Sequence, residues 1–180
     1  MSHVGRLLVA TPLIADPSFE RTVVLLLAHG VEGAFGVVVN RPSDTPVVEV
    51  ADEWVPHVAA PGVVFLGGPV GGEAVVGLAR RGDRPDDHFG LVAGDLGTID
   101  LHRPPEPGED AGPVRLFAGS AGWTSGQLED EVAEGAWWPV DGGPDDVLGD
   151  DPAGLWARVL RRQPGQVAWF ANHPHDPTAN

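Results

Sequence analysis

The sequence of 180 residues contains no cysteine, no tyrosine and no lysine, so all eleven of its basic residues are arginines. The absence of cysteine excludes a thiol nucleophile, an iron–sulfur cluster, a cysteine zinc finger and a disulfide framework. The absence of lysine excludes the phosphate-binding lysine of P-loop proteins and any Schiff-base enzyme. The glycine-rich stretch 67–72 lacks the spacing of a dinucleotide-binding loop, and we expect no cofactor.

Negative charge dominates the chain, because 26 acidic and 11 basic residues give a formal net charge of −15. Nucleic-acid binders need a basic patch that displaces counterions from phosphates. Here only Arg80 with Arg81 and Arg161 with Arg162 are adjacent basic pairs, so we expect no direct binding to nucleic acids or to anionic membranes. The chain has no apolar stretch of membrane-spanning length, no signal-peptide pattern and no cysteine, which together predict a cytoplasmic protein.

Short apolar runs separated by turn signals predict more strands than helices. The predicted strands cover residues 7–10, 23–27, 35–39, 63–66, 75–79, 115–118, 136–140 and 166–170, with shorter pieces near 91–92 and 99. Helices are predicted over 47–54, from an N-cap at Thr124 to Gly135 with Gln127 completing a capping box, and after Asp151 with Pro152 in the first turn.

These elements predict an α+β fold: one compact domain over residues 1–180, with largely antiparallel β-sheets flanked by a few short helices. A regular βαβ repeat does not fit, because few helices reach crossover length. Residues 81–112, which are acidic and rich in proline and glycine, are expected to form a surface loop region. Residues 171–180 are expected to be a flexible tail.

Polar residues and glycines gather where the predicted strands end, and such positions often line binding pockets. If the strands around 23–27 and 35–39 form a hairpin, His29 and Asn40 lie at its opposite ends. The expected ligand-binding residues are Arg21, His29, Asn40, Gly67, Gly68, Pro69, Gly119, Ser120, Gly122, Trp123 and Gln127.

Two further patterns carry weaker signals. A nucleophile elbow needs glycine two residues before its serine, but Ala118 precedes Gly119 and Ser120, so a tight strand-to-helix turn is the better interpretation. His173 and His175, followed by Asp176, have metal-ligand chemistry. Because they lie in a proline-rich segment near the chain end, we expect them to be solvated and predict no metal site.

Five pieces of the chain follow one another in a characteristic order: residues 5–12, 16–24, 29 with 33–42, 65–70, and 122–123 followed by 126–131 with Trp137 or Trp138 after them. Taken together, these pieces resemble the YqgE/AlgH family. The resemblance implies a compact α+β cytoplasmic domain, and one family member carries a name tied to transcriptional control of alginate synthesis. This sequence departs from the family pattern at Ser120, at Thr124 with Ser125, and near residues 77–80, where relatives carry a histidine.

Three functions follow as hypotheses. The first is a small-molecule-binding or indirect regulatory module, in which Arg21 pairs with a small anionic ligand. The second is a hydrolase or transferase acting on an anionic metabolite, with His29 as the candidate catalytic acid or base. The third is an acidic adaptor that docks a basic protein partner.

Overall fold

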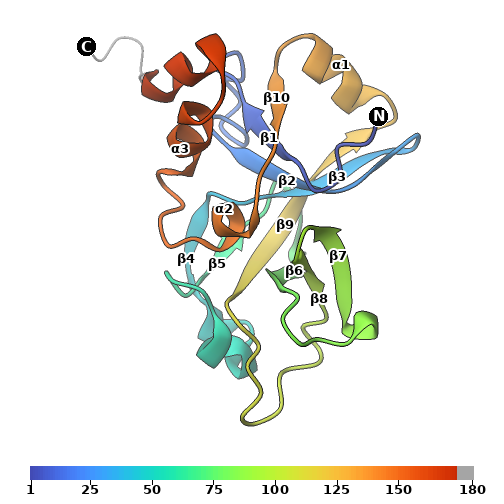
Figure 1. The fold of residues 1–180 in the computed structure, drawn as a ribbon, viewed down its shortest axis with the longest axis vertical. Helices are drawn as coiled ribbons and strands as arrows, with labels where there is room; N and C mark the ends of the chain where they lie inside the picture. Colours follow the sequence, from blue (N-terminus) through green and yellow to red (C-terminus); the bar gives the residue numbers. More distant parts are fainter. Residues whose placement is uncertain (174–180) are drawn as a thin grey trace.

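The computed structural model describes residues 1–173 and shows a curled, mostly antiparallel sheet with a few short helices, which confirms the α+β prediction (Figure 1). Within these residues the sheet has ten strands: β1 (Leu7–Ala10), β2 (Val23–Gly30), β3 (Gly33–Val38), β4 (Pro42–Pro46), β5 (Val63–Leu66), β6 (Val70–Arg80), β7 (Phe89–Ala93), β8 (Leu96–Ile99), β9 (Val114–Thr124) and β10 (Trp137–Val140). The α-helices are α1 (Gln127–Ala133), α2 (Pro144–Leu148) and α3 (Leu155–Arg161), and the 3-10 helices are η1 (Val47–Glu49), η2 (Asp52–His57), η3 (Asp86–His88) and η4 (Gly165–Asn172).

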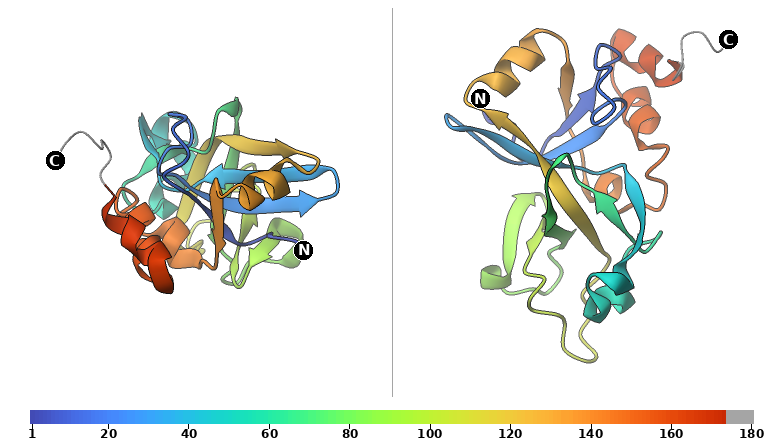
Figure 2. Two further views of the ribbon diagram at one scale, coloured as in Figure 1. Left: turned by 90° about the horizontal axis from the view of Figure 1, so that it is seen from above. Right: turned by 180° about the vertical axis from the view of Figure 1, so that it is seen from behind.

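Strand β9 joins the two halves of the sheet, as Figures 1 and 2 show. The strand order is β10-β1-β2-β3-β9-β6-β8-β7, and β5 pairs in parallel with β9 and antiparallel with β4. The first half of β9 pairs with β6, and its second half pairs with β3. Side chains from both halves therefore meet along one continuous strand.

The core lies on both faces of the central strands. In β1, Leu7 contributes to one buried cluster and Leu8 to another, because successive side chains point to opposite faces. Helix α3 covers the first cluster with Leu155, and α1 covers the second with Leu128. A third cluster, around Trp54, lies beside β6 and β9. This two-sided burial explains why the strands read as continuous apolar runs.

Two element predictions are wrong. Residues 166–170 form part of η4 rather than a strand. The helix begins at Gly165, which has a φ of 68°. Val167 and Ala171 then pack into the same buried cluster as α3. Residues 47–54, predicted as one short helix, are divided between two 3-10 helices, η1 and η2. In each case tertiary packing overrides the local apolar pattern.

The helix starts also differ from those predicted. Helix α1 begins after Gly126 rather than after Thr124, yet the side chain of Gln127 still accepts the main-chain N–H of Thr124 at 3.0 Å. Helix α3 begins at Leu155, and Asp151 accepts the N–H of Gly154 within the turn before it.

The segment 81–112 is only partly a loop. It contains η3 and, over the strand pieces predicted near 91–92 and 99, strands β7 and β8, while α2 lies where no helix was predicted. At the C-terminal end, Ala171 is buried rather than part of a flexible tail, and His175 and Asp176 lie outside the described residues. Among residues 1–173, no helix is long and apolar enough to cross a membrane.

Candidate functional site

Arg21 and Asn40 meet at the start of β2. The side-chain oxygen of Asn40 accepts the N–H of Val23 at 2.9 Å, and its amide nitrogen donates to the carbonyl of Arg21 at 3.0 Å. These bonds fix Arg21 at a φ of 55°, a conformation that non-glycine residues seldom adopt. The Arg21 guanidinium lies 4.1 Å from the ring centre of Trp156 and donates to the carbonyl of His173. The Arg21 side chain is therefore engaged in packing against Trp156 and in a hydrogen bond to the main chain.

The glycines at 67–68 and 119 bring two stretches of backbone into contact. A Cβ at Gly67 would lie 2.3 Å from the carbonyl oxygen of Gly119, and one at Gly68 would lie 2.2 Å from the carbonyl carbon of Ser120. Gly68 has φ of 149° and Gly119 has φ of 77°. Only glycine fits such a close approach.

The expected strand-to-helix turn at residues 119–122 is not formed. Strand β9 runs through this segment, pairing Gly122 with Phe35 of β3. Opposite Gly119, β6 bulges between Val70 and Val75. The prediction was wrong because β3 and β6 pair with this segment and hold it as a strand. The glycines themselves do not indicate those partners.

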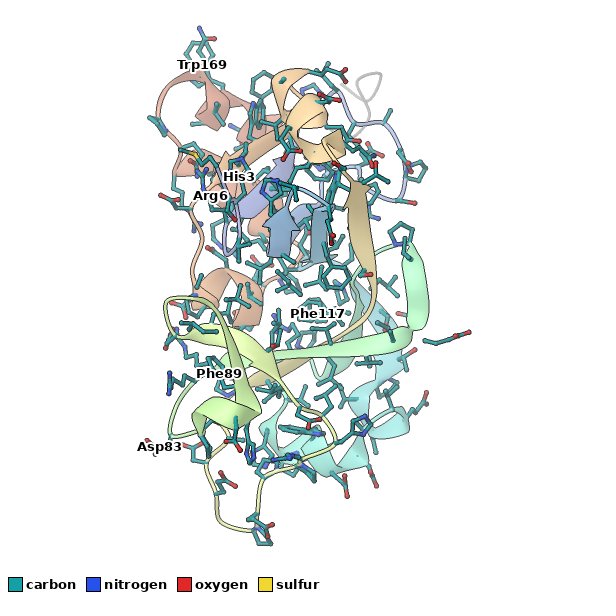
Figure 3. The ribbon with its side chains drawn as sticks, turned by 90° about the vertical axis from the view of Figure 1, so that its right-hand side faces the viewer. His3, Arg6, Asp83, Phe89, Phe117 and Trp169 are labelled. Carbon is teal, nitrogen blue, oxygen red and sulfur yellow. The ribbon has the colours of Figure 1, made fainter. Side chains whose placement is uncertain are left out.

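His29 lies at the far end of the β2–β3 hairpin from Asn40, with its side chain only 3% exposed. Its Nδ1 accepts the main-chain N–H of His3 at 3.1 Å, so in the neutral ring Nε2 carries the proton and donates to Glu129 Oε1 at 2.7 Å. The two histidine rings stack with centroids 5.5 Å apart. Figure 3 shows His3 beside Arg6, whose Nη1 lies 3.3 Å from the His3 ring.

Neighbouring groups lower the pKa values of His3 and Glu129. Burial, with the positive charge of Arg6, lowers the pKa of His3. A hydrogen bond to a main-chain N–H in the first turn of α1, with the bond from His29, lowers the pKa of Glu129. Because both ring nitrogens of His29 already have partners, this arrangement leaves neither of them available for proton transfer to a substrate.

Trp123 and Gln127 converge on Glu131, which the sequence reasoning missed. Glu131 Oε2 accepts the indole N–H of Trp123 at 2.8 Å and that of Trp137 at 2.9 Å, and Oε1 accepts from Gln127. The two indoles contact edge to face. The signal available in the sequence was an acidic residue one helical turn after Gln127.

Beside the hairpin, an open groove of about 540 Å³ brings His29 and Trp123 together. Its other lining residues are mostly apolar or glycine: Ala28, Gly30, Val31, Glu32, Gly33, Ala34 and Phe35.

A smaller cleft, which we call the Arg41 cleft, lies where three segments of the chain meet. The turn at Ser18 forms one side, Arg41 the next, and the Gly68–Pro69 turn the third. Its volume is about 180 Å³, and its lining residues are Ser18, Val38, Arg41, Leu66, Gly68 and Pro69. Gly68 and Pro69 were predicted as site residues. Arg41 was not, although it closes a predicted strand.

The guanidinium of Arg41 is partly buried and held by main-chain carbonyls. Nη1 donates to the carbonyl of Ser18 at 2.7 Å and Nη2 to that of Glu20 at 2.9 Å. Within residues 1–173, Arg41 forms no ion pair. Burial lowers its pKa, and the more distant charges of Glu20 and Asp16 oppose that shift.

Two more donors of the cleft have no acceptor among the described residues. These are the main-chain N–H of Gly68 and the hydroxyl of Ser18. The residues that line this small cleft therefore carry a cation and two uncharged donors, and they include no carboxylate.

Comparison with known proteins decides the family. A family model described as AlgH-like matches residues 7–168. The chain belongs to the AlgH-like family. The resemblance read from the sequence is thus confirmed.

Several relatives of this AlgH-like chain match it over most of their length. A UPF0301 protein of Streptomyces coelicolor is 49% identical over 185 residues, covering 99% of this chain and 96% of the relative. A UPF0301 protein of Thermobifida fusca is also 49% identical, over 191 residues, covering 100% and 96%.

Two solved structures share the fold. A crystal structure of a protein from Corynebacterium diphtheriae superposes with a TM-score of 0.89 at 33% identity, covering 95% of this chain and 92% of that one. The solution structure of the AlgH protein from Pseudomonas aeruginosa gives a TM-score of 0.66 at 26% identity, covering 96% and 94%.

Within residues 1–173, the predicted site residues of this AlgH-like chain fall in different places rather than around one of the pockets described above. Arg21 and Asn40 brace the start of β2, His29 and Trp123 line the groove, and Gly68 and Pro69 line the Arg41 cleft. No group of three or more metal-ligating side chains occurs among the described residues.

A third hollow, a cavity of about 480 Å³, lies beside η3 and the loop after β8. Its basic side chains have close internal partners: Arg84 donates to the carbonyl of Arg80, and Arg103 contacts both His88 and Asp100. Unlike the Arg41 cleft, this cavity has carboxylates among its lining residues, namely Asp100, Glu106 and Glu109.

Proposed function

We propose that this AlgH-like protein is a small-molecule-binding module whose ligand is a small anion held in the Arg41 cleft. Arg41 takes the anion-pairing role that the sequence suggested for Arg21. Any regulatory role is then indirect, because a net charge of −15 disfavours contact with nucleic acid.

One observation carries the proposal: a partly buried guanidinium lines a cleft and has no ion-pair partner within the described residues. Removing a cation from water is costly unless a counter-charge compensates it. The Ser18 and Glu20 carbonyls orient the guanidinium without adding a negative charge, and the carboxylates of Glu20 and Asp16, which favour the cation, do not outweigh the effect of burial on its pKa. An anion beside the donors of Ser18 and Gly68 supplies that charge.

The geometry favours this function over catalysis by His29. Both ring nitrogens of His29 are occupied, by His3 and Glu129, and the ring is almost fully buried. A general base needs a free nitrogen within hydrogen-bond reach of the substrate proton. Binding at the Arg41 cleft needs no such rearrangement.

The test is a titration of the full chain with sodium acetate, sulfate and inorganic phosphate at constant pH and ionic strength. NMR signals of the Gly68 amide and the Arg41 Nε–H report the cleft directly. A ligand at 100 times its Kd also stabilises the fold by about 2.7 kcal/mol, which raises the melting temperature.

Variants locate the site. Arg41→Gln should abolish the response, and Ser18→Ala, which removes one hydroxyl, should weaken it with the fold intact. The matched control is Arg161→Gln, which removes the same charge from an exposed helix position. If none of the anions moves the Gly68 or Arg41 signals, or if Arg41→Gln binds normally while folded, the proposal is wrong.

A further inference from the structure

The geometry points to a ligand class for the Arg41 cleft: a small monocarboxylate carrying a short apolar chain. This inference rests on the proposed function and narrows it. It comes from the charge balance around Arg41, from the three apolar residues among those that line the cleft and from the cleft volume.

The charge balance favours a single negative charge. The cleft holds one cation, and the carboxylates of Asp16 and Glu20 lie near enough to act on it. A phosphate group carries about −1.5 to −2 charges at neutral pH, so these carboxylates repel it more strongly than they repel a monoanion.

The donors suit a planar carboxylate. A guanidinium has five N–H donors, and the carbonyls of Ser18 and Glu20 take two of them. Three donors of Arg41 remain, and a planar guanidinium edge matches the two oxygens of one carboxylate. The Gly68 N–H and the Ser18 hydroxyl are further donors along the cleft.

The walls of the cleft favour an apolar chain on the ligand. Val38, Leu66 and Pro69 form half of its lining residues. Leu66 is 51% exposed and Val70, next to Pro69, is 58% exposed, so the rim leaves apolar surface in water. A hydrocarbon chain on the ligand would bury part of that surface.

The volume limits the chain length. At about 30 Å³ for each water molecule, the cleft of about 180 Å³ accommodates roughly six non-hydrogen atoms. Butanoate has about that size, whereas longer chains would extend past Leu66 into solvent.

The experiment compares Kd values for acetate, propanoate, butanoate and hexanoate, with inorganic phosphate and the uncharged butanamide as controls. We use the same Gly68 and Arg41 NMR signals of the full chain. Each added methylene should lower Kd about fourfold, from about 0.8 kcal/mol per buried CH₂, and the trend should stop after butanoate. Phosphate and butanamide should each bind at least tenfold more weakly than butanoate.

A variant at the rim tests the apolar wall. In Leu66→Ser, the ratio of Kd values between successive carboxylates should fall from about four towards one. The exposed control Val48→Ser should leave that ratio unchanged. If phosphate binds as tightly as butanoate, or if affinity ignores chain length, the carboxylate inference is overturned while the anion site stands. If neither carboxylates nor phosphate move the signals, the proposed function fails as well.

Discussion

Replacing Arg115 by methionine removes a buried cation that joins three segments of the chain. Arg115 lies in β9, is 1% exposed and packs its guanidinium 4.3 Å from the ring centre of Phe65. Nη1 donates to the carbonyls of Val147 at 2.7 Å and Gly149 at 2.9 Å, and Nη2 donates to that of Ala60. Methionine keeps much of the volume and removes all three bonds.

Two opposing effects set the change in the free energy of unfolding of Arg115→Met. Burial lowers the pKa of Arg115 to about 10 from 12.5, so holding the cation there costs about 3 kcal/mol at neutral pH, and methionine removes that cost. Against it, three carbonyls lose their donor, at about 1–3 kcal/mol each when they stay buried. Taking the middle of that range, we expect a net loss of about 3 kcal/mol. In a protein of this size, this lowers the melting temperature by about 6–12 °C.

The assay is urea unfolding followed by tryptophan fluorescence, with thermal unfolding as a second measurement. The control is Arg158→Met, which removes a partly exposed arginine that pairs with Asp151 on the surface, and should change stability by less than about 1 kcal/mol. Unchanged or greater stability of Arg115→Met would refute the reasoning, because it would mean that the desolvation cost of the cation outweighs its three hydrogen bonds.

Three further predictions concern stability. Gly68→Ala should destabilise the protein by at least about 3 kcal/mol in urea unfolding, because its Cβ would lie 2.2 Å from the carbonyl of Ser120; Gly71→Ala, with open space around it, should cost only about 1 kcal/mol. Glu131→Ala should cost about 2–4 kcal/mol and shift the tryptophan emission maximum, since two indole N–H groups lose their acceptor; an unchanged spectrum would count against that contact. For Asp146, burial raises the carboxyl pKa, but hydrogen bonds from Arg162 and a main-chain N–H outweigh it, so the net pKa is lowered. Its stabilising effect is therefore complete well above the unfolded pKa of about 3.8 and is lost as the pH falls below it. Asp146→Asn should accordingly be less stable than the native chain at pH 7, and the difference should shrink as the pH falls below 3.8; a pH-independent difference would contradict this assignment.

The apolar pattern predicted the strands that tertiary contacts support on both faces. Residues 7–10 and 63–66 were predicted as strands, and β1 and β5 have those bounds. The run at 166–170 has a similar pattern but folds as η4, because it packs against α3. A local pattern shows that residues will be buried, while the partner decides whether they are buried as strand or helix.

The candidate site was less predictable. Arg21 and Arg41 both flank predicted strands, and nothing local distinguishes them. The fold turns Arg21 onto Trp156 and presents Arg41 to a cleft. Likewise, the sequence placed His29 in a polar position but could not show that His3 would occupy its ring nitrogen.

The sequence by itself excluded chemistry that depends on cysteine or lysine. It also determined the α+β class, the family and most strand positions, because these depend on composition and on short-range patterns of residues. Only the tertiary structure decided that β9 continues through its glycines, that the predicted site residues separate into different places, and that Ser18, Arg41 and Gly68 meet. These features depend on strand pairing between segments far apart in the chain, and the free energy of that pairing does not appear in any local run of residues.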